Sequence, residues 1–210
     1  MSDWKKFNQD PNLIKFTTPL PETSDLSLIS NVNSRVLDLG CGYGRVLAHL
    51  RDNGYKDLTG VDVSKELIQR AKKVCPEASY FIQDIENVSL AGKFDLVLLM
   101  AVIEYIIGDV RQDIFFKKVA GLLNEEGVIF LETFTIDFKL NWKNYVHGFV
   151  KNGHFGCFAN SLGIKCHHQS IGKLRNILER YFKIVKCEKL ELTTWSNNIC
   201  NGYGFILKKR

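Results

Sequence analysis

The sequence predicts an α/β protein in which helices cover both faces of a mostly parallel sheet. Short apolar runs alternate along the chain with segments whose apolar residues recur at helical spacing. Residues 94–100 are nearly all apolar, which is typical of a strand buried on both faces. Regular alternation of strands and helices favours a parallel sheet with crossover helices.

The first half of the chain contains four expected strands and two helices. Ser64 precedes a segment with apolar residues at helical spacing, so we expect it to be the N-cap of that helix. In chain order, the elements of this half are strand 36–39, helix 46–50, strand 56–62, helix 64–74, strand 79–82 and strand 94–100.

The second half continues the alternation. Asp109 is expected as an N-cap with Gln112 at the capping-box position, and residues 124–127 are expected to form a turn. A later helix should begin near Ser170. The remaining elements are helix 109–123, strand 128–133 and two closing strands, 182–194 and 202–208, joined by residues 195–198.

A glycine-rich turn follows the first strand and indicates a nucleotide cofactor. The pattern is Asp38-x-Gly40-x-Gly42-x-Gly44. Glycine lets the backbone approach a ligand closely, and the helix behind the turn offers free N–H groups. The dinucleotide fingerprint would need its third glycine at Arg45, which argues against a nicotinamide cofactor. An acid just before the turn also favours a ligand with a cationic end over a pyrophosphate.

A second acid supports this interpretation. Asp62 ends the second expected strand about 20 residues beyond the glycines, the spacing at which a carboxylate binds a ribose diol in dinucleotide folds. For Asp38 and Asp62 the alternative is a solvated strand end with no ligand.

These motifs together resemble the class I S-adenosylmethionine-dependent methyltransferases. The resemblance covers residues 34–133 well and the rest loosely, and it is carried by 38–44, 60–62, 84–85 and 94–97 followed by Glu104-Tyr105. It implies a Rossmann-like, doubly wound, mostly parallel seven-stranded sheet with an antiparallel last strand. It also implies S-adenosylmethionine as cofactor and S-adenosylhomocysteine as product.

The resemblance assigns cofactor-binding roles to residues at the ends of the first four strands. They are Asp38, Gly40, Cys41, Gly42, Asp62, Val63, Asp84, Ile85 and Met100.

In that assignment Asp38 faces the methionine ammonium and Asp62 holds the ribose hydroxyls. Val63 and Ile85 sandwich the adenine, and Asp84 accepts from its exocyclic amine. The Met100 carbonyl faces the amino-acid end. For Val63, Ile85 and Met100 the alternative is ordinary core packing.

Glu104 and Tyr105 are the candidate catalytic residues, since they follow the fourth strand at the rim of the expected cleft. Many small-molecule members of the family carry Glu-His there, so Tyr105 departs from the pattern and a histidine base is not supported. Glu104 would contact the cofactor or cap the next helix, and Tyr105 would touch the acceptor. A general base is needed only when the acceptor carries a proton.

We expect one domain over residues 1–210. Its parts are an N-terminal lid or cap (1–30), a cofactor-binding core (31–133), an acceptor-side insertion (134–169) and a closing helix with a hairpin (170–210). The insertion is rich in aromatic and histidine residues, which suits a pocket for a small apolar or cationic acceptor, or a lid that packs its own core.

No metal is predicted. His154, Cys157, Cys166 and His167 could form a four-ligand set, but their spacing matches no standard zinc site.

Composition limits the remaining classes. No apolar run is long enough to span a membrane, and no signal core follows the N-terminus, so we expect a cytoplasmic protein with free thiols. The net charge of +5 is mild, and no basic stripe interleaved with aromatics indicates nucleic acid. The expected partner is a small-molecule acceptor, and the expected state is a monomer or homodimer.

The sequence therefore predicts methyl transfer from S-adenosylmethionine to an oxygen or nitrogen of a small molecule. The alternatives are a methyltransferase that acts on RNA or protein, and a non-catalytic binding module that keeps the fold.

Overall fold

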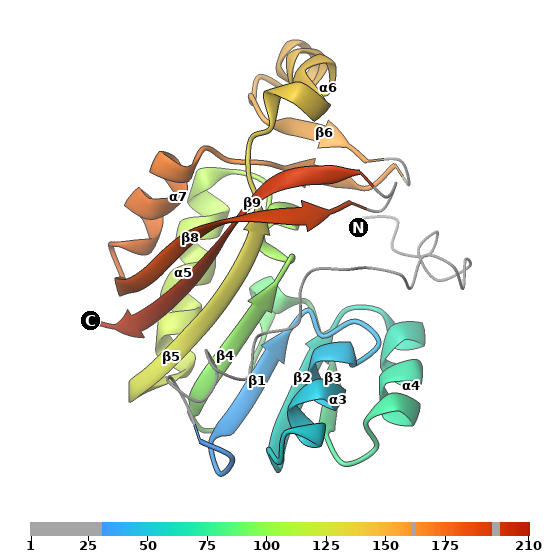
Figure 1. Ribbon diagram of the computed structural model, residues 1–210, viewed down its shortest axis with the longest axis vertical. Helices are drawn as coiled ribbons and strands as arrows, with labels where there is room; N and C mark the ends of the chain where they lie inside the picture. The colour runs from blue at the N-terminus through green and yellow to red at the C-terminus, as the bar shows by residue number, and fades with distance from the viewer. Residues whose placement is uncertain (1–30, 161–162, 195–197) are drawn as a thin grey trace.

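The computed structural model describes residues 31–160, 163–194 and 198–210, and its main feature is a seven-stranded sheet (Figure 1). The strand order is β3-β2-β1-β4-β5-β9-β8. The strands are β1 (Arg35–Leu39), β2 (Asp57–Asp62), β3 (Ser79–Ile82), β4 (Phe94–Met100), β5 (Leu123–Phe134), β8 (Phe182–Thr193) and β9 (Ile199–Lys209). Pairs among β1 to β5 are parallel, whereas β9 is antiparallel to both β5 and β8. The predicted fold class is confirmed.

Helices cover both faces of this sheet. They are α3 (Arg45–Asp52), α4 (Lys65–Val74), α5 (Asp109–Leu122) and α7 (Ile171–Leu178). The helix α6 (Phe138–Asn152) does not cover the sheet but packs against β6 (Cys157–Ala159), and two 3-10 turns, η2 (Ile85–Asn87) and η3 (Ile103–Tyr105), follow β3 and β4. One core layer joins the sheet to α5 and α7, and the other joins it to α3 and α4. In β4, Val97 and Leu99 belong to the first layer and Leu96 and Leu98 to the second, which explains its continuous apolar run.

Several predicted details hold. The Ser64 hydroxyl accepts from the Leu67 N–H and caps α4, and the Ser170 hydroxyl accepts from the Lys173 N–H at the start of α7. The closing strands form the expected hairpin, but part of its connection (195–197) and the N-terminal segment 1–30 lie outside the described residues. All six cysteines are free thiols.

Two predicted boundaries are wrong. Gly108, with φ 98°, occupies the N-cap of α5, and Asp109 is already its first helical residue. The Gln112 amide does not complete a capping box, because it is buried and donates to the carbonyls of Ile103 and Ile106. Residues 124–127 are not a separate turn but part of β5, where the register with β4 shifts.

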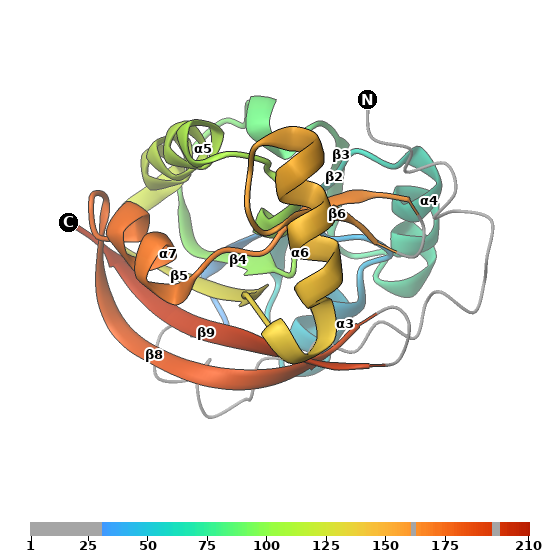
Figure 2. The ribbon, with the colours of Figure 1, turned by 90° about the horizontal axis from the view of Figure 1, so that it is seen from above.

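The insertion 134–169 has a structure that the sequence did not predict. It consists of α6 and a small antiparallel sheet of β6 (Cys157–Ala159) and β7 (Lys165–His167). Fully buried Tyr145 packs against Phe155, Phe158 and His168. The insertion therefore has its own aromatic core, and it lies beyond the carboxyl ends of the main strands (Figures 1 and 2).

Two helical glycines differ in what surrounds them. A Cβ on Gly148 of α6 would lie 1.6 Å from the Cys157 carbonyl oxygen, whereas a Cβ on Gly121 of α5 would meet nothing within 4 Å. We expect Gly148→Ala to lower the free energy of unfolding by about 2 kcal/mol, because α6 must move off β6. Gly121→Ala should be neutral or stabilising by about 0.5–1 kcal/mol. Urea unfolding of both variants tests this, and equal effects would contradict the packing described.

Candidate functional site

The candidate site lies at the carboxyl edge of the sheet, where the strand order reverses between β1 and β4. β1 is followed by α3 on the β2 side, and β4 lies on its other side. In open α/β sheets, ligands bind at such a switch point. The loop from Gly40 to Gly44 crosses this edge.

The backbone of this loop is held against β2 by hydrogen bonds. The N–H groups of Gly40 and Cys41 both donate to the Val61 carbonyl, at 2.8 and 3.0 Å. The Gly42 N–H donates to Oδ2 of Asp62 at 3.0 Å. The Cys41 side chain is buried in the α3 layer, and its Sγ lies 3.8 Å from the Gly42 carbonyl oxygen.

Two glycines of the loop are required for different reasons. Gly40 has φ 83°, and a Cβ there would lie 2.5 Å from Cγ2 of Val102. Gly42 has φ 53°, but a Cβ on it would meet nothing within 4 Å. Open space above a glycine in a fastened loop is where a ligand can approach the backbone closely.

Asp62 holds the loop as well as facing the site. Its Oδ1 accepts from the Ser64 N–H at 2.8 Å, while Oδ2 accepts from Gly42. Burial raises its pKa above the ordinary value, and these backbone hydrogen bonds oppose that rise. The carboxylate is therefore fixed at the end of β2, where each oxygen keeps further accepting capacity.

Asp38 is buried beside the loop with one oxygen unsatisfied. Its side chain is 1% exposed, and Oδ2 has no hydrogen-bond partner. Burial is the main cause that raises its pKa to about 7, the negative charge of Asp62 adds to the rise, and Arg45 opposes it. An unpartnered buried carboxyl is costly, and a cationic ligand group would satisfy it.

The residues expected around an adenine lie at the ends of β2 and β3. Val63 is exposed, and Ile85 is partly buried against the core layer of α5 and α7. Asp84 caps η2, since its Oδ1 accepts from the Glu86 N–H at 3.0 Å.

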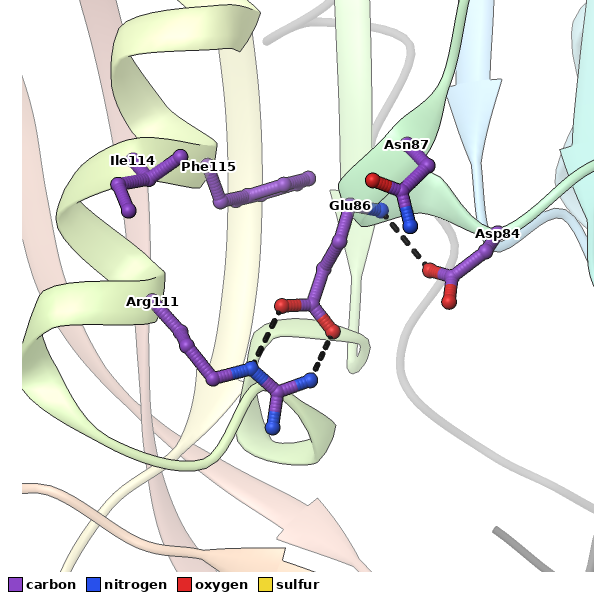
Figure 3. Close-up of a pocket in the computed structure, with 6 residues that line it drawn as sticks. All are labelled: Asp84, Glu86, Asn87, Arg111, Ile114 and Phe115. Carbon is purple, nitrogen blue, oxygen red and sulfur yellow. Dashed lines mark hydrogen bonds and ion pairs between the residues drawn. The ribbon is translucent and has the colours of Figure 1, made fainter. Parts of the chain in front are cut away.

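A hollow of about 310 Å³ adjoins Asp84 (Figure 3). It lies between η2 and α5 and is lined by Asp84, Glu86, Asn87, Arg111, Ile114 and Phe115. Arg111 forms a two-point ion pair with Glu86 across it. Neither Asp38 nor Asp62 lines this hollow, so it belongs to the Asp84 end of the edge.

A strained residue follows β4 directly. Ala101 has φ 52°, the only positive value at a non-glycine residue within the described ranges. Its N–H donates to the Glu132 carbonyl at 2.8 Å, which holds it in place. This conformation costs about 1 kcal/mol, and such strain tends to persist at functional sites. It turns the chain sharply after Met100, and no sequence pattern predicts it.

Glu104, one of the two candidate catalytic residues, is buried behind this turn. The Thr133 hydroxyl donates to its Oε2 at 3.2 Å, and Oε1 has no partner. Burial is the main cause that raises its pKa to about 8. Gln112 fixes the surrounding turn, since its side-chain amide donates to the carbonyls of Ile103 in η3 and of Ile106 directly after it. Tyr105, the other candidate, is half-buried in the same turn.

Sequence reasoning missed a third buried acid, Glu132. It pairs in register with Met100 on the neighbouring strand, and its Oε2 has no partner. Burial is the main cause that raises its pKa to about 7, with Arg45 opposing the rise. The available signal was the position of Glu132 in the strand, directly after the apolar residues 128–131 and shortly before Phe134. The structure thus gathers Asp38, Glu104 and Glu132 at one sheet edge.

The histidine and cysteine residues of the insertion form no metal set. Cys157 pairs with His167 across β6 and β7, and His168 turns into the aromatic core. Within the described ranges, no group of three or more His, Cys, Asp or Glu residues could hold a metal ion.

Comparisons with known proteins agree with this fold. Residues 14–181 match the family described as "Methyltransferase domain". A ubiquinone biosynthesis O-methyltransferase of Bradyrhizobium diazoefficiens is 32% identical over 120 residues, which cover 55% of this chain and 44% of that relative. The chain thus spans less than half the length of this curated relative.

Two solved structures show the same fold. An S-adenosylmethionine-dependent methyltransferase from Methanosarcina mazei has a TM-score of 0.82 at 23% identity, covering 90% of this chain and 99% of that one. The N-methyltransferase NodS of Bradyrhizobium japonicum, crystallised with S-adenosylhomocysteine, has a TM-score of 0.63 at 15% identity, covering 90% and 89%.

This chain belongs to the methyltransferase-domain family, and its resemblance to the class I S-adenosylmethionine-dependent methyltransferases is confirmed. The cofactor expected from the sequence, S-adenosylmethionine, is the cofactor of that family.

The buried carboxyls predict an unusual pH dependence for the ligand-free protein. The folded-state pKa of Glu104, about 8, lies above the ordinary value of about 4.3 in an unfolded chain. The folded state therefore binds more protons between these values, and stability should fall as pH rises, by up to about 1.4 kcal/mol per pH unit for each such carboxyl.

Glu104→Gln should flatten this fall, because the amide stays neutral at every pH. Urea unfolding between about pH 5 and pH 8 measures the slope. The matched control is Glu125→Gln, at an exposed acid whose pKa is lowered by its bond to Lys209. A slope unchanged by Glu104→Gln would contradict the burial of a protonated carboxyl.

Proposed function

We propose that this chain transfers a methyl group from S-adenosylmethionine to an oxygen or nitrogen of a small-molecule acceptor. The observation that carries the proposal is the fastened glycine loop with open space above Gly42 beside the unsatisfied carboxyl of Asp38. A cofactor with a cationic amino-acid end and a ribose fits that combination, because the ammonium group would meet Asp38 and the ribose hydroxyls would meet Asp62.

The chain's own residues would bind and orient the cofactor. Asp38 would take the ammonium, Asp62 the ribose hydroxyls, and exposed Val63 with Ile85 the adenine faces. The strained turn at Ala101 would keep the Met100 carbonyl at the amino-acid end. When bound, the cofactor supplies an electrophilic methyl group, so the protein mainly has to align the acceptor and exclude water.

Glu104 is the residue we propose for proton removal. Its raised pKa, about 8, makes it a stronger base than an ordinary carboxylate once it is ionised. An acceptor hydroxyl or protonated amine would need such a base, and a neutral amine would not. Tyr105, in the same turn, is proposed to contact the acceptor.

The relatives support both acceptor atoms. The Bradyrhizobium diazoefficiens relative is named an O-methyltransferase, and NodS is named an N-methyltransferase. Activity on RNA or protein remains the alternative, which a steep salt dependence of acceptor binding would favour. We further propose that the protein is cytoplasmic and is a monomer or a homodimer.

Cofactor binding is tested by alanine substitutions at two glycines whose backbone has a positive φ. Gly42 and Gly153 both have positive φ, and a Cβ on either would meet nothing within 4 Å. Gly42→Ala and Gly153→Ala should therefore each destabilise the fold by about 1 kcal/mol. Only Gly42→Ala should weaken S-adenosylmethionine binding in calorimetry, by about tenfold or more. Equal affinities in the two variants would exclude the loop as the cofactor site.

Methyl transfer is tested with a radiolabelled methyl donor and separate panels of phenols, carboxylates and amines. The wild type should label members of one panel. Glu104→Gln should lower kcat by about 10²-fold or more for acceptors that carry a proton at the working pH, with little change in cofactor affinity. Cofactor binding without labelling of any panel would favour the non-catalytic module.

A further inference from the structure

A continuous apolar stripe is exposed along α6. Trp142 is 54% exposed, Phe149 53% and Val150 81%, and Phe138 and Val146 complete the row. Successive members are separated by four, four, three and one residues, so at 3.6 residues per turn they share one side of the helix. Large apolar side chains gathered in this way mark an interaction surface rather than ordinary scattered exposure.

Packing fixes the rotation of α6, so this stripe cannot turn inward. Asn141 and Tyr145 are buried, and Gly148 lies directly against the Cys157 carbonyl. The Asp137 N–H donates to the Tyr145 hydroxyl, which also lies 2.9 Å from Nδ1 of His168. These contacts occupy the inner side of the helix and leave the stripe facing outward.

After the buried N-cap acid Asp137, the charge along this part of the chain has one sign. No Asp or Glu occurs from residue 138 to residue 178. This stretch carries Lys139, Lys143, Lys151, Lys165, Lys173 and Arg175. Lys173 and Arg175 pair with Asp109 and Glu179, whereas the α6 lysines form no ion pair with any described residue. Lys139 and Lys143 border the stripe beside Val150 on the helix surface.

We propose that α6 docks in the plane of an anionic lipid surface. A helix with Trp, Phe and Val on one side and lysines beside them, and with no acid, is the kind that lies at a bilayer interface. Its 15 residues extend about 22 Å, shorter than a membrane span. Within the described ranges, no helix is both long and apolar enough to cross a membrane.

The position of α6 gives this docking a consequence for the acceptor. The helix stands beyond the carboxyl ends of β4 and β5, on the side of the molecule where the candidate site opens (Figures 1 and 2). The docking itself does not depend on the proposed methyl transfer. If that transfer holds, an amphiphilic acceptor would reach the site from the lipid surface.

Sedimentation of the full chain with vesicles, without cofactor or acceptor, tests the docking separately from the reaction. The wild type should bind vesicles of phosphatidylcholine and phosphatidylglycerol and should leave them as salt rises. It should bind pure phosphatidylcholine much more weakly. Lys139→Gln and Lys143→Gln should each weaken binding by about fivefold.

The contribution of the apolar side chains of the stripe is tested with a matched control on α5. Phe149→Ser/Val150→Ser should weaken vesicle binding by about tenfold or more. Val110→Ser/Ile114→Ser removes a similarly exposed pair on α5, 74% and 58% exposed, and should leave binding unchanged. Both double variants should keep the wild-type melting temperature. If Phe149→Ser/Val150→Ser melts at a lower temperature than the wild type, the single variant Val150→Ser is used in its place.

Three results would overturn the proposal. They are no binding to anionic vesicles, equal binding to neutral and anionic vesicles, and equal losses in the α6 and α5 variants. Sedimentation velocity supplies a further check. A wild-type dimer that Phe149→Ser/Val150→Ser dissociates, with no vesicle binding, would assign the stripe to a second copy of the chain instead.

Discussion

The close passage of the Gly40–Gly44 backbone over the ends of β1 and β2 is the constraint on which the rest of the site depends. Two N–H groups donate to one carbonyl of β2, and a third donates to the Asp62 carboxylate. Val102 leaves no room for a Cβ at Gly40. The loop can adopt this path only with glycine, and the path leaves the backbone at Gly42 open to a ligand.

The burial of three carboxyls decides the electrostatics of the site. Asp38, Glu104 and Glu132 are buried at the sheet edge, and each has one oxygen without a hydrogen-bond partner. Their raised pKa values mean that the ligand-free site holds protons that ordinary carboxyls would have lost. Such a site stores unfavourable desolvation that a cationic ligand relieves on binding. Stability and ligand affinity are coupled through the same groups.

Local patterns were sufficient to predict the first four strands and the two helices between them. The apolar run of β4 and the Ser64 cap are decided by neighbours in sequence, so they could be predicted. The α5 start could not, because the tertiary contacts of Gln112 with η3 override the capping-box pattern. The secondary structure of the insertion was not predicted, because Gly148, a poor helix former, is explained only by its contact with β6. Glu132 was missed because burial of an acid in a strand depends on what covers it.

The most direct test is the number of protons exchanged when S-adenosylmethionine binds at about pH 7. Calorimetry in two buffers with different ionisation enthalpies measures it. If the cofactor's ammonium meets Asp38, whose pKa is about 7, binding should ionise that carboxyl and release roughly half a proton. Asp38→Asn should abolish the release. Tight binding with no proton release in the wild type would contradict the pairing of the cationic end with the buried acid.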